Sequence, residues 1–264
     1  MLVERPDGAK IAWDSTGSGS AVLLIMGLAY PMTSWFRQVP VLAERHQVIT
    51  IDNRGAGQTG DVVGAPYTVE TMAGDCLAVL DAAGVERAHV VGISMGGLMA
   101  QEIALSHPER VQSLCLMATH PGLVDGVWPA EMQAFMAARL GMSPEESREF
   151  SIPFNYAEGT SRELIEQDWA MRAAGTASPA GYLAQGGTTA WAGLARLPQI
   201  TAPTLVMAGD KDALVVPANS EKIAAAIPGA RLVIVPDANH ILTTDQADAV
   251  NDLLLDWFAA NEAG

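Results

Sequence analysis

The sequence Val-Val-Gly-Ile-Ser-Met-Gly-Gly, residues 90–97, places Ser94 between two glycines at the point where a strand-like run meets a helix-like run. β-branched residues precede it, and alternating small and large apolar residues continue to His107, before the helix breaker Pro108. Gly-x-Ser-x-Gly in this context is typical of a nucleophile elbow. Residues without a side chain are needed there because the strained turn brings backbone segments close together. We expect the Ser94 hydroxyl to lie exposed at the carboxyl end of a sheet; the alternative is an ordinary turn whose serine caps the helix.

A serine hydroxyl needs a base at neutral pH, and the chain has five histidines. His240 fits best because it follows the strand-like run 231–235 in a polar loop, which places its ring at the same sheet edge as Ser94. His120 is the rival, since it leaves the carboxyl end of another strand-like run, and it is expected to line the pocket. The other histidines are expected at the opposite end of the sheet or at the surface: His89, His46 and His107.

The acid that orients the histidine is expected after the buried-strand pattern that ends in Gly-Asp-Lys-Asp, residues 209–212. We assign this role to Asp212, three residues beyond the glycine, as the acceptor of the second N–H of the histidine. Asp210 is expected to hold the turn through side-chain to backbone hydrogen bonds. The resulting chain order is Ser94, Asp212, His240, which is the order expected for α/β-hydrolases.

With these residues the chain resembles an α/β-hydrolase of the serine esterase and lactonase type over nearly its whole length. Three further segments match the strand and turn patterns of that family: Ile49–Thr59, Ser106–Val111 and Ile227–Ala230. The Met-Gly segment at residues 26–27 and the Asp-Asn-Arg-Gly turn at residues 52–55 are similar to methyl-esterase-like and enol-lactonase-like members. The resemblance implies a mostly parallel, twisted sheet with helices on both faces and an inserted α-helical cap.

The resemblance also implies an oxyanion hole formed by the backbone N–H groups of Leu28 and Met95. Each such donor typically contributes about 3 kcal/mol of transition-state stabilisation. Met26 stands where family members usually carry histidine. Two interpretations of Met26 stay open, namely apolar packing under the loop and a direct part in substrate specificity.

Strand-like and helix-like segments alternate along the chain, as in an α/β fold. The expected strands are 11–13, 21–26, 47–51, 88–93, 111–118, 204–208 and 231–235. A helix is expected over 68–84, with Thr68 as its N-cap and Met72, Cys76, Val79 and Leu80 on one face.

Between His120 and about Pro198 the strand pattern disappears, and helices are expected over 129–140, 144–150, 161–174 and 179–191. We expect a core domain of residues 1–120 and 199–264 and a helical cap of residues 121–198. A cap at this point covers the carboxyl ends of the strands, where ligands bind. Several residues either line the substrate pocket there or form the cap's own core: Trp128, Met132, Phe135 and Met136.

Composition limits the partners. A chain of 264 residues that is 49% hydrophobic can bury one α/β core, and a net charge of −15 disfavours nucleic acid and anionic membrane surfaces. The first eight residues lack a basic start followed by an apolar core, so we expect a soluble cytoplasmic protein. Cys76 and Cys115 are expected to be buried free thiols. No metal or organic cofactor is expected, and a homodimer is left open.

These observations predict hydrolysis of a small carboxylic ester or lactone through an acyl-enzyme. A thioesterase would use the same residues, and a ligand-binding or signalling protein with slow turnover is the alternative from another class. Lactonases of dicarboxylate substrates need a cation in the pocket. The cap offers four arginines, which either serve that purpose or lie on solvated helix faces: Arg139, Arg148, Arg162 and Arg172.

Overall fold

The computed structural model describes residues 1–264 except 66, 139–140, 174, 176 and 263–264. The strands are β1 (Leu2–Glu4), β2 (Lys10–Thr16), β3 (Ser20–Ile25), β4 (His46–Ile51), β5 (Ala88–Ile93), β6 (Val111–Met117), β7 (Thr204–Gly209) and β8 (Arg231–Val235). The α-helices are α1 (Val39–Leu42), α2 (Val69–Ala82), α3 (Met95–Ser106), α4 (Ala130–Ala138), α5 (Pro144–Phe150), α6 (Ile152–Asn155), α7 (Arg162–Ala173), α8 (Pro179–Gly186), α9 (Pro217–Ala226), α10 (Leu242–Asp245) and α11 (Ala247–Ala260). Short 3-10 helices are η1 (Met32–Trp35), η2 (Pro108–Arg110), η3 (Gly187–Ala190) and η4 (Leu197–Gln199).

Within the described residues the strands form one eight-stranded sheet in the order β1-β2-β4-β3-β5-β6-β7-β8. Strands β3 to β8 pair in parallel, whereas β1 and β2 join in antiparallel fashion at one edge. The chain leaves β3 toward β4 on one side and later returns to β5 on the other. Ligands of open α/β sheets bind beyond the carboxyl ends of the strands at such a reversal. We therefore expect the ligand site beyond the carboxyl ends of β3 and β5.

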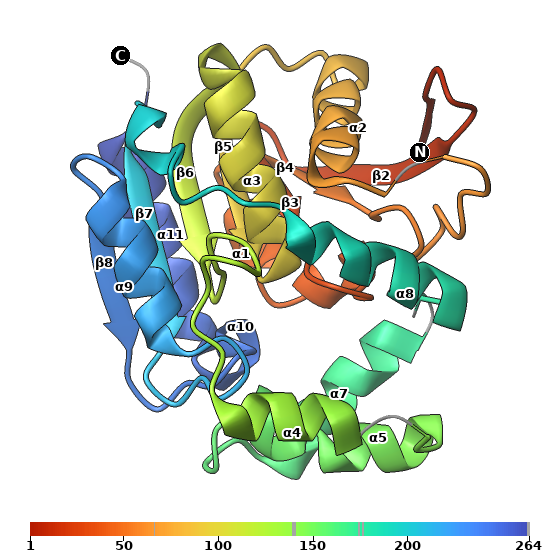
Figure 1. Ribbon diagram of the computed structural model, residues 1–264. Helices are drawn as coiled ribbons and strands as arrows, with labels where there is room; N and C mark the ends of the chain where they lie inside the picture. Colours follow the sequence, from red (N-terminus) through yellow and green to blue (C-terminus); the bar gives the residue numbers. More distant parts are fainter. Residues whose placement is uncertain (66, 139–140, 174, 176, 263–264) are drawn as a thin grey trace.

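Helices cover both faces of the sheet, and the central parallel strands β3, β5, β6 and β7 are buried on both sides as this arrangement requires. Helices α2, α3 and α9 lie in front of the sheet in Figure 1, and α11 lies behind it. Val90 of β5 packs with Leu98 of α3 in one hydrophobic cluster. Its neighbour Val91 packs in a second cluster with Phe258 of α11. Successive residues of one strand thus serve two cores.

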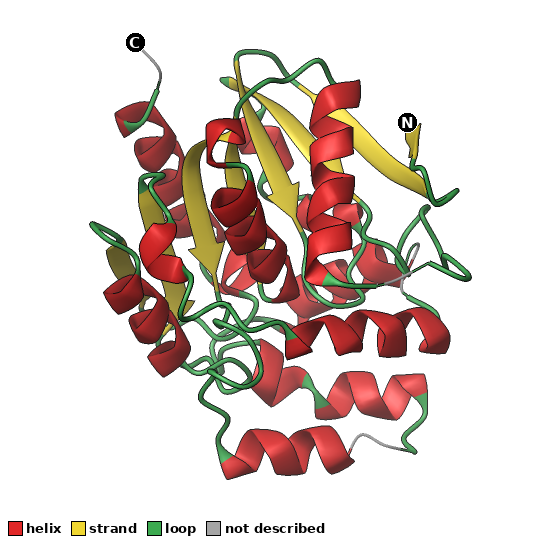
Figure 2. Ribbon diagram, turned by 45° about the horizontal axis from the view of Figure 1, so that its top comes forward, coloured by secondary structure: helices red, strands yellow, loops and turns green. Residues whose placement is uncertain are grey.

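Helices α4 to α8, between β6 and β7, lie beyond the ends toward which the strand arrows point (Figures 1 and 2). This confirms the expected helical insertion over the carboxyl edge of the sheet. Helices α5 and α7 coincide closely with the predicted segments, whereas the predicted helix 179–191 is divided into α8 and η3. The predicted end of the first cap helix, residues 139–140, lies outside the described residues. We keep the name cap for residues 121–198, and their status as a separate unit stays a prediction.

The predicted strands are all present, and those at 88–93 and 231–235 have the expected bounds. Thr68 caps α2, with its hydroxyl accepting the N–H of Thr71 at 3.1 Å. The short strand β1 was not predicted. The surface location expected for His46 is wrong: the residue begins β4, is buried, and hydrogen bonds through Nδ1 to the Ser20 hydroxyl at 2.8 Å. No helix in the described part of the chain is long and apolar enough to cross a bilayer.

Candidate active site

Ser94 occupies the turn between β5 and α3 in a strained conformation, with φ 54° and ψ −123°. Its N–H donates to the Met117 carbonyl at 2.9 Å, and its carbonyl accepts the Thr119 hydroxyl at 2.6 Å. These two bonds hold a backbone geometry that costs about 1–3 kcal/mol in a residue with a side chain. The Ser94 side chain makes no capping hydrogen bond, unlike an ordinary N-cap serine. The hydroxyl is therefore left available at the elbow.

No side chain fits at the glycines on either side of Ser94, because the neighbouring backbone is too close. A Cβ on Gly92 would lie 2.4 Å from the Gly96 carbonyl oxygen, and one on Gly96 would lie 2.2 Å from the carbonyl oxygen of Ile25. Both contacts are with backbone, so no side-chain movement relieves them. On the neighbouring loop, a Cβ on Gly27 would lie 3.0 Å from the Ser94 Cβ. The glycines thus bring the end of β3 against the elbow.

His240 lies between Ser94 and Asp212. Its Nε2 is 3.1 Å from the Ser94 Oγ, and its Nδ1 is 3.0 Å from Oδ2 of Asp212. The other carboxylate oxygen of Asp212 accepts the backbone N–H groups of Leu214 at 3.0 Å and Val215 at 2.7 Å. Asp212 is only 3% exposed, so this buried carboxylate has hydrogen-bond partners at both oxygens.

Asp210 has different surroundings. One of its oxygens lies 2.7 Å from Nζ of Lys211 at the surface, and the other accepts the Ala238 N–H at 3.3 Å. The Asp210 side chain thus bonds to the backbone of the loop that precedes His240, as expected for a residue that holds the turn. Of the two aspartates, Asp212 is the one within hydrogen-bond distance of the histidine ring.

Asn239 connects the loop that follows β7 with the loop that follows β8. Its Oδ1 accepts the N–H groups of His240 at 2.8 Å and Ala213 at 3.1 Å. Its Nδ2 donates to the carbonyls of Pro153 at 2.9 Å and Tyr156 at 3.1 Å, in the cap segment that includes α6. A single buried side chain therefore fixes both loops and their contact with the cap.

The backbone N–H groups of Leu28 and Met95 belong to residues that line the cavity at Ser94. Neither N–H has an acceptor among the described residues. Met26 is buried, and its carbonyl accepts the Asn53 side-chain N–H at 2.9 Å, which fixes the loop without the histidine usual at this position. Two unused donors beside a hydroxyl are the arrangement that an oxyanion hole needs.

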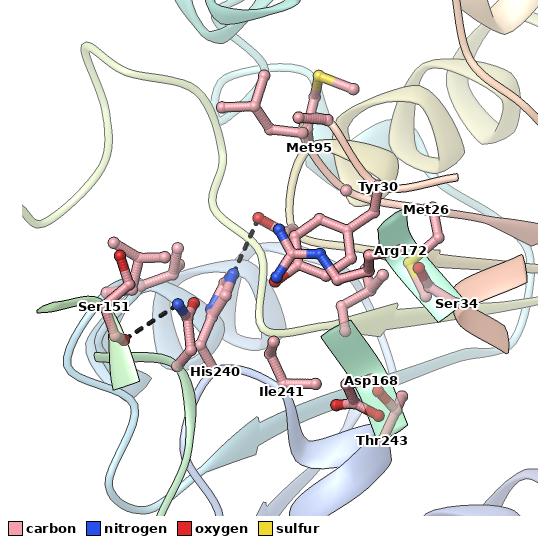
Figure 3. A pocket seen from close by; sticks show the side chains of 18 of the residues that line it. Met26, Tyr30, Ser34, Met95, Ser151, Asp168, Arg172, His240, Ile241 and Thr243 are labelled. Carbon is pink, nitrogen blue, oxygen red and sulfur yellow. Dashed lines mark hydrogen bonds between the residues drawn. The ribbon is translucent and has the colours of Figure 1, made fainter. Parts of the chain in front are cut away.

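A cavity of about 870 Å³ opens over Ser94 and His240. The five residues expected at the substrate pocket line this cavity, namely Met26, His120, Trp128, Met132 and Met136. The cavity extends from His240 to Tyr30, Asp168 and Arg172, which also line it (Figure 3). Its volume is in the range of small-molecule sites.

His120 is held away from the base position. Its Nδ1 accepts the N–H of Gly122 at 3.1 Å, and its ring meets Trp128 edge-on at 4.7 Å between ring centres. Burial lowers the pKa of His120 to about 4, so its ring is neutral at pH 7. Of the two candidate bases, His240 is the one that contacts Ser94.

The cap residues divide between the cavity and the cap's own core. Phe135 stacks on Phe154 with 3.9 Å between ring centres and does not line the cavity. Arg148 and Arg172 line it, whereas Arg162 forms ion pairs at the surface with Glu149 and Glu166. Arg139 lies outside the described residues.

Apart from Arg172, which was one of the four arginines considered as a pocket cation, the sequence did not point to the polar end of the cavity. The Asp168 carboxylate accepts the Thr244 hydroxyl at 2.7 Å and lies 3.5 Å from the Arg37 guanidinium, and burial raises its pKa. The Arg172 guanidinium lies 3.5 Å from the centre of the Tyr30 ring. These residues come from distant parts of the chain and share no local motif, so no spacing pattern announces them.

Comparisons with known proteins give a consistent result. Residues 20–246 match the model of the alpha/beta hydrolase fold family. A protein of Azorhizobium caulinodans named "Putative carbamate hydrolase RutD" is 34% identical over 252 residues, which cover 94% of each chain. The structure of Est816, described as an N-acyl homoserine lactone degrading enzyme, is similar with a TM-score of 0.84 and 30% identity, covering 97% of this chain and 100% of that one.

The structure of the enol-lactonase from Burkholderia xenovorans LB400 has a TM-score of 0.83 and 25% identity, and covers 95% of this chain and 96% of the other. The match extends well beyond the elbow motif to nearly the whole sheet and its helices. The sheet order, the strained serine and the family match agree, and the chain belongs to the α/β-hydrolase fold family of enzymes.

Proposed function

We propose that this protein is a serine hydrolase that cleaves a small carboxylic ester or lactone through an acyl-enzyme. The observation that carries the proposal is the hydrogen-bonded series from Asp212 through His240 to the Ser94 hydroxyl, which opens into a cavity large enough for a small molecule. In this proposal Ser94 is the nucleophile, His240 the base and Asp212 the orienting acid.

The geometry suits two-step acyl transfer. His240 Nε2 takes the Ser94 proton as Oγ attacks the carbonyl carbon, and Asp212 stabilises the imidazolium through Nδ1–H. The N–H groups of Leu28 and Met95 stabilise the oxyanion, and the imidazolium then donates its proton to the leaving alkoxide. Water, deprotonated by His240, attacks the acyl-enzyme and returns the Ser94 hydroxyl. All of these proton transfers use His240.

The cavity wall favours a substrate with an apolar part. Met26, Trp128, Met132 and Met136 line it together with other apolar side chains. The names of the similar proteins refer to a carbamate, an acyl lactone and an enol-lactone, each with a carbonyl bonded to a leaving oxygen or nitrogen. This shared chemistry supports an ester or lactone here and adds carbamates to the compounds worth testing.

The test is the hydrolysis of p-nitrophenyl esters of increasing acyl length, simple lactones and carbamates by the purified protein and by Ser94→Ala. We expect multiple turnovers by the parent protein that disappear in the variant. Thioester cleavage with the same Ser94 dependence would identify a thioesterase. Equal rates for both proteins on every compound would contradict the proposal and favour the ligand-binding alternative.

A further inference from the structure

We propose that Gln185 of the cap is a positioning residue for the oxyanion loop, an inference that rests on the proposed function. Gln185 lies in α8 and is 0% exposed. Its Oε1 accepts the backbone N–H of Ala29 at 2.6 Å, and its Nε2 donates to the carbonyl of Arg54 at 2.6 Å. A single cap side chain thereby joins the residue after Leu28 to the core turn.

The turn that Gln185 contacts is intrinsically strained. The Tyr30 N–H donates to the Gly27 carbonyl at 3.3 Å, which places Leu28 and Ala29 at the centre of a β-turn. Ala29 has φ 66°, in the left-handed region where such turns usually carry glycine or asparagine. Alanine has no side-chain oxygen with which to stabilise that conformation, so the support has to come from outside the loop. The short bond from the Ala29 N–H to Gln185 provides it, and what fixes this turn also fixes the N–H of Leu28.

The other end of the Gln185 amide is anchored to a rigid group. Arg54 is 1% exposed, and its guanidinium donates to Asp75 at 2.8 Å and to Asp7 at 2.6 Å. These ion pairs hold the backbone whose carbonyl accepts Nε2 of Gln185. An amide is a neutral side chain with a donor and an acceptor on one planar group. The Arg54 carbonyl takes the NH₂ end, and this directs Oε1 toward Ala29.

Helix α8 is seated closely enough to hold this geometry. A Cβ on Gly181 would lie 2.5 Å from the carbonyl oxygen of Gly55, so the helix backbone rests directly on the core turn. The N–H of Gly57 also donates to the Gly175 carbonyl at 2.7 Å. Figure 1 shows α8 as the cap helix beside the sheet, between α2 and α7. The position of the cap and the shape of the oxyanion loop are therefore coupled through one amide.

The test uses Gln185→Met, which keeps the length of the side chain but removes the donor and the acceptor. We expect kcat for a p-nitrophenyl ester to fall about 10- to 100-fold, with KM changed less than about twofold, because a misplaced oxyanion donor weakens the transition state and not the bound ester. An alkylboronic acid, which forms a tetrahedral adduct with Ser94, should lose affinity by a similar factor. The carboxylate product of the same chain length should bind as before.

Two further variants complete the test. Leu183→Ala, at a 74% exposed position of the same helix, should leave kcat, KM and boronic acid affinity unchanged. Gln185→Glu keeps an acceptor for Ala29 but loses the donor to the Arg54 carbonyl, so kcat should fall here too, and it is the variant measured if Gln185→Met does not fold.

The outcomes separate the two proposals. Unchanged kcat and boronic acid affinity in the Gln185 variants would overturn the positioning role, and so would an equal loss of affinity for the boronic acid and the product, which would indicate only a displaced cap. Parent protein that neither hydrolyses esters nor binds the boronic acid would overturn the proposed function, and this inference with it.

Discussion

His240 Nε2 lies 3.1 Å from the Ser94 Oγ, although 146 residues separate them in the sequence. They meet because β5 and β8 are strands of the same parallel sheet, and the loops that follow them emerge at one edge. Each partner is held by its surroundings, Ser94 by a strained turn and His240 by Asn239 and Asp212. Substitutions that preserve shape can therefore separate the proposed roles.

Asp212→Asn should lower kcat by about 10³- to 10⁴-fold with the fold intact. The amide fills the same space but no longer stabilises the imidazolium, and its NH₂ favours the wrong ring tautomer of His240. Steady-state kinetics with a p-nitrophenyl ester, together with thermal unfolding, would measure both effects.

The matched control is Asp210→Asn, two residues away on the same loop. Asp210 lies against Lys211 and the Ala238 N–H and not against the histidine ring, so we expect less than about a tenfold change in kcat. A larger loss from Asp210→Asn than from Asp212→Asn would show that the orienting acid has been assigned to the wrong residue.

Gly96→Ala should destabilise the protein by more than about 2 kcal/mol, because the added methyl group meets backbone that has no room to move. The relevant contact is the 2.2 Å approach to the Ile25 carbonyl oxygen. Denaturant unfolding monitored by circular dichroism gives the change in the free energy of unfolding.

Gly159→Ala is the control for this substitution. A Cβ at that position has no neighbour within 4 Å, so the free energy of unfolding should change by no more than about 0.5 kcal/mol. Similar values for the two variants would mean that the elbow is not closely packed.

The buried histidine His89 should make the protein less stable at acid pH. Burial lowers its pKa to about 4, whereas the unfolded chain has a histidine pKa of about 6.5. As pH falls from 7 to 5, His89 becomes protonated in the unfolded chain but stays mostly neutral in the folded chain. The free energy of unfolding therefore decreases. This residue should account for about 1–2 kcal/mol of that decrease.

His89→Gln should therefore have a shallower decrease in the free energy of unfolding between pH 7 and pH 5, measured by urea unfolding at both values. His107→Gln, at an exposed position, should keep the slope of the parent protein. Parallel slopes for the parent and His89→Gln would refute the assignment of this proton to His89.

Local signals account for the parts of the structure that were predicted. Glycines on both sides of Ser94 indicate the elbow, because only glycine fits the backbone contacts there. Runs of β-branched residues predict the bounds of β5 and β8. The strand β1 was missed because its three residues are mostly exposed and show no apolar alternation. The surface location predicted for His46 was wrong because it was inferred from charged sequence neighbours. The hydrogen-bond partner that allows its burial, Ser20, lies on the adjacent strand and is distant in the sequence.

The rest of the site depends on contacts across the chain. Met132 faces the cavity and Phe135 the cap core, a choice set by the stack with Phe154 rather than by helical spacing. Gln185 meets Ala29 across 156 residues, and nothing near either residue in the sequence indicates this bond.

The most direct measurement is the intact mass of the protein after reaction with a fluorophosphonate, followed by peptide mapping of the adduct. We expect one phosphonyl group per chain, bonded to Ser94, and no labelling of Ser94→Ala. An unlabelled parent protein, or an adduct on any other residue, would contradict the assignment of Ser94 as the nucleophile.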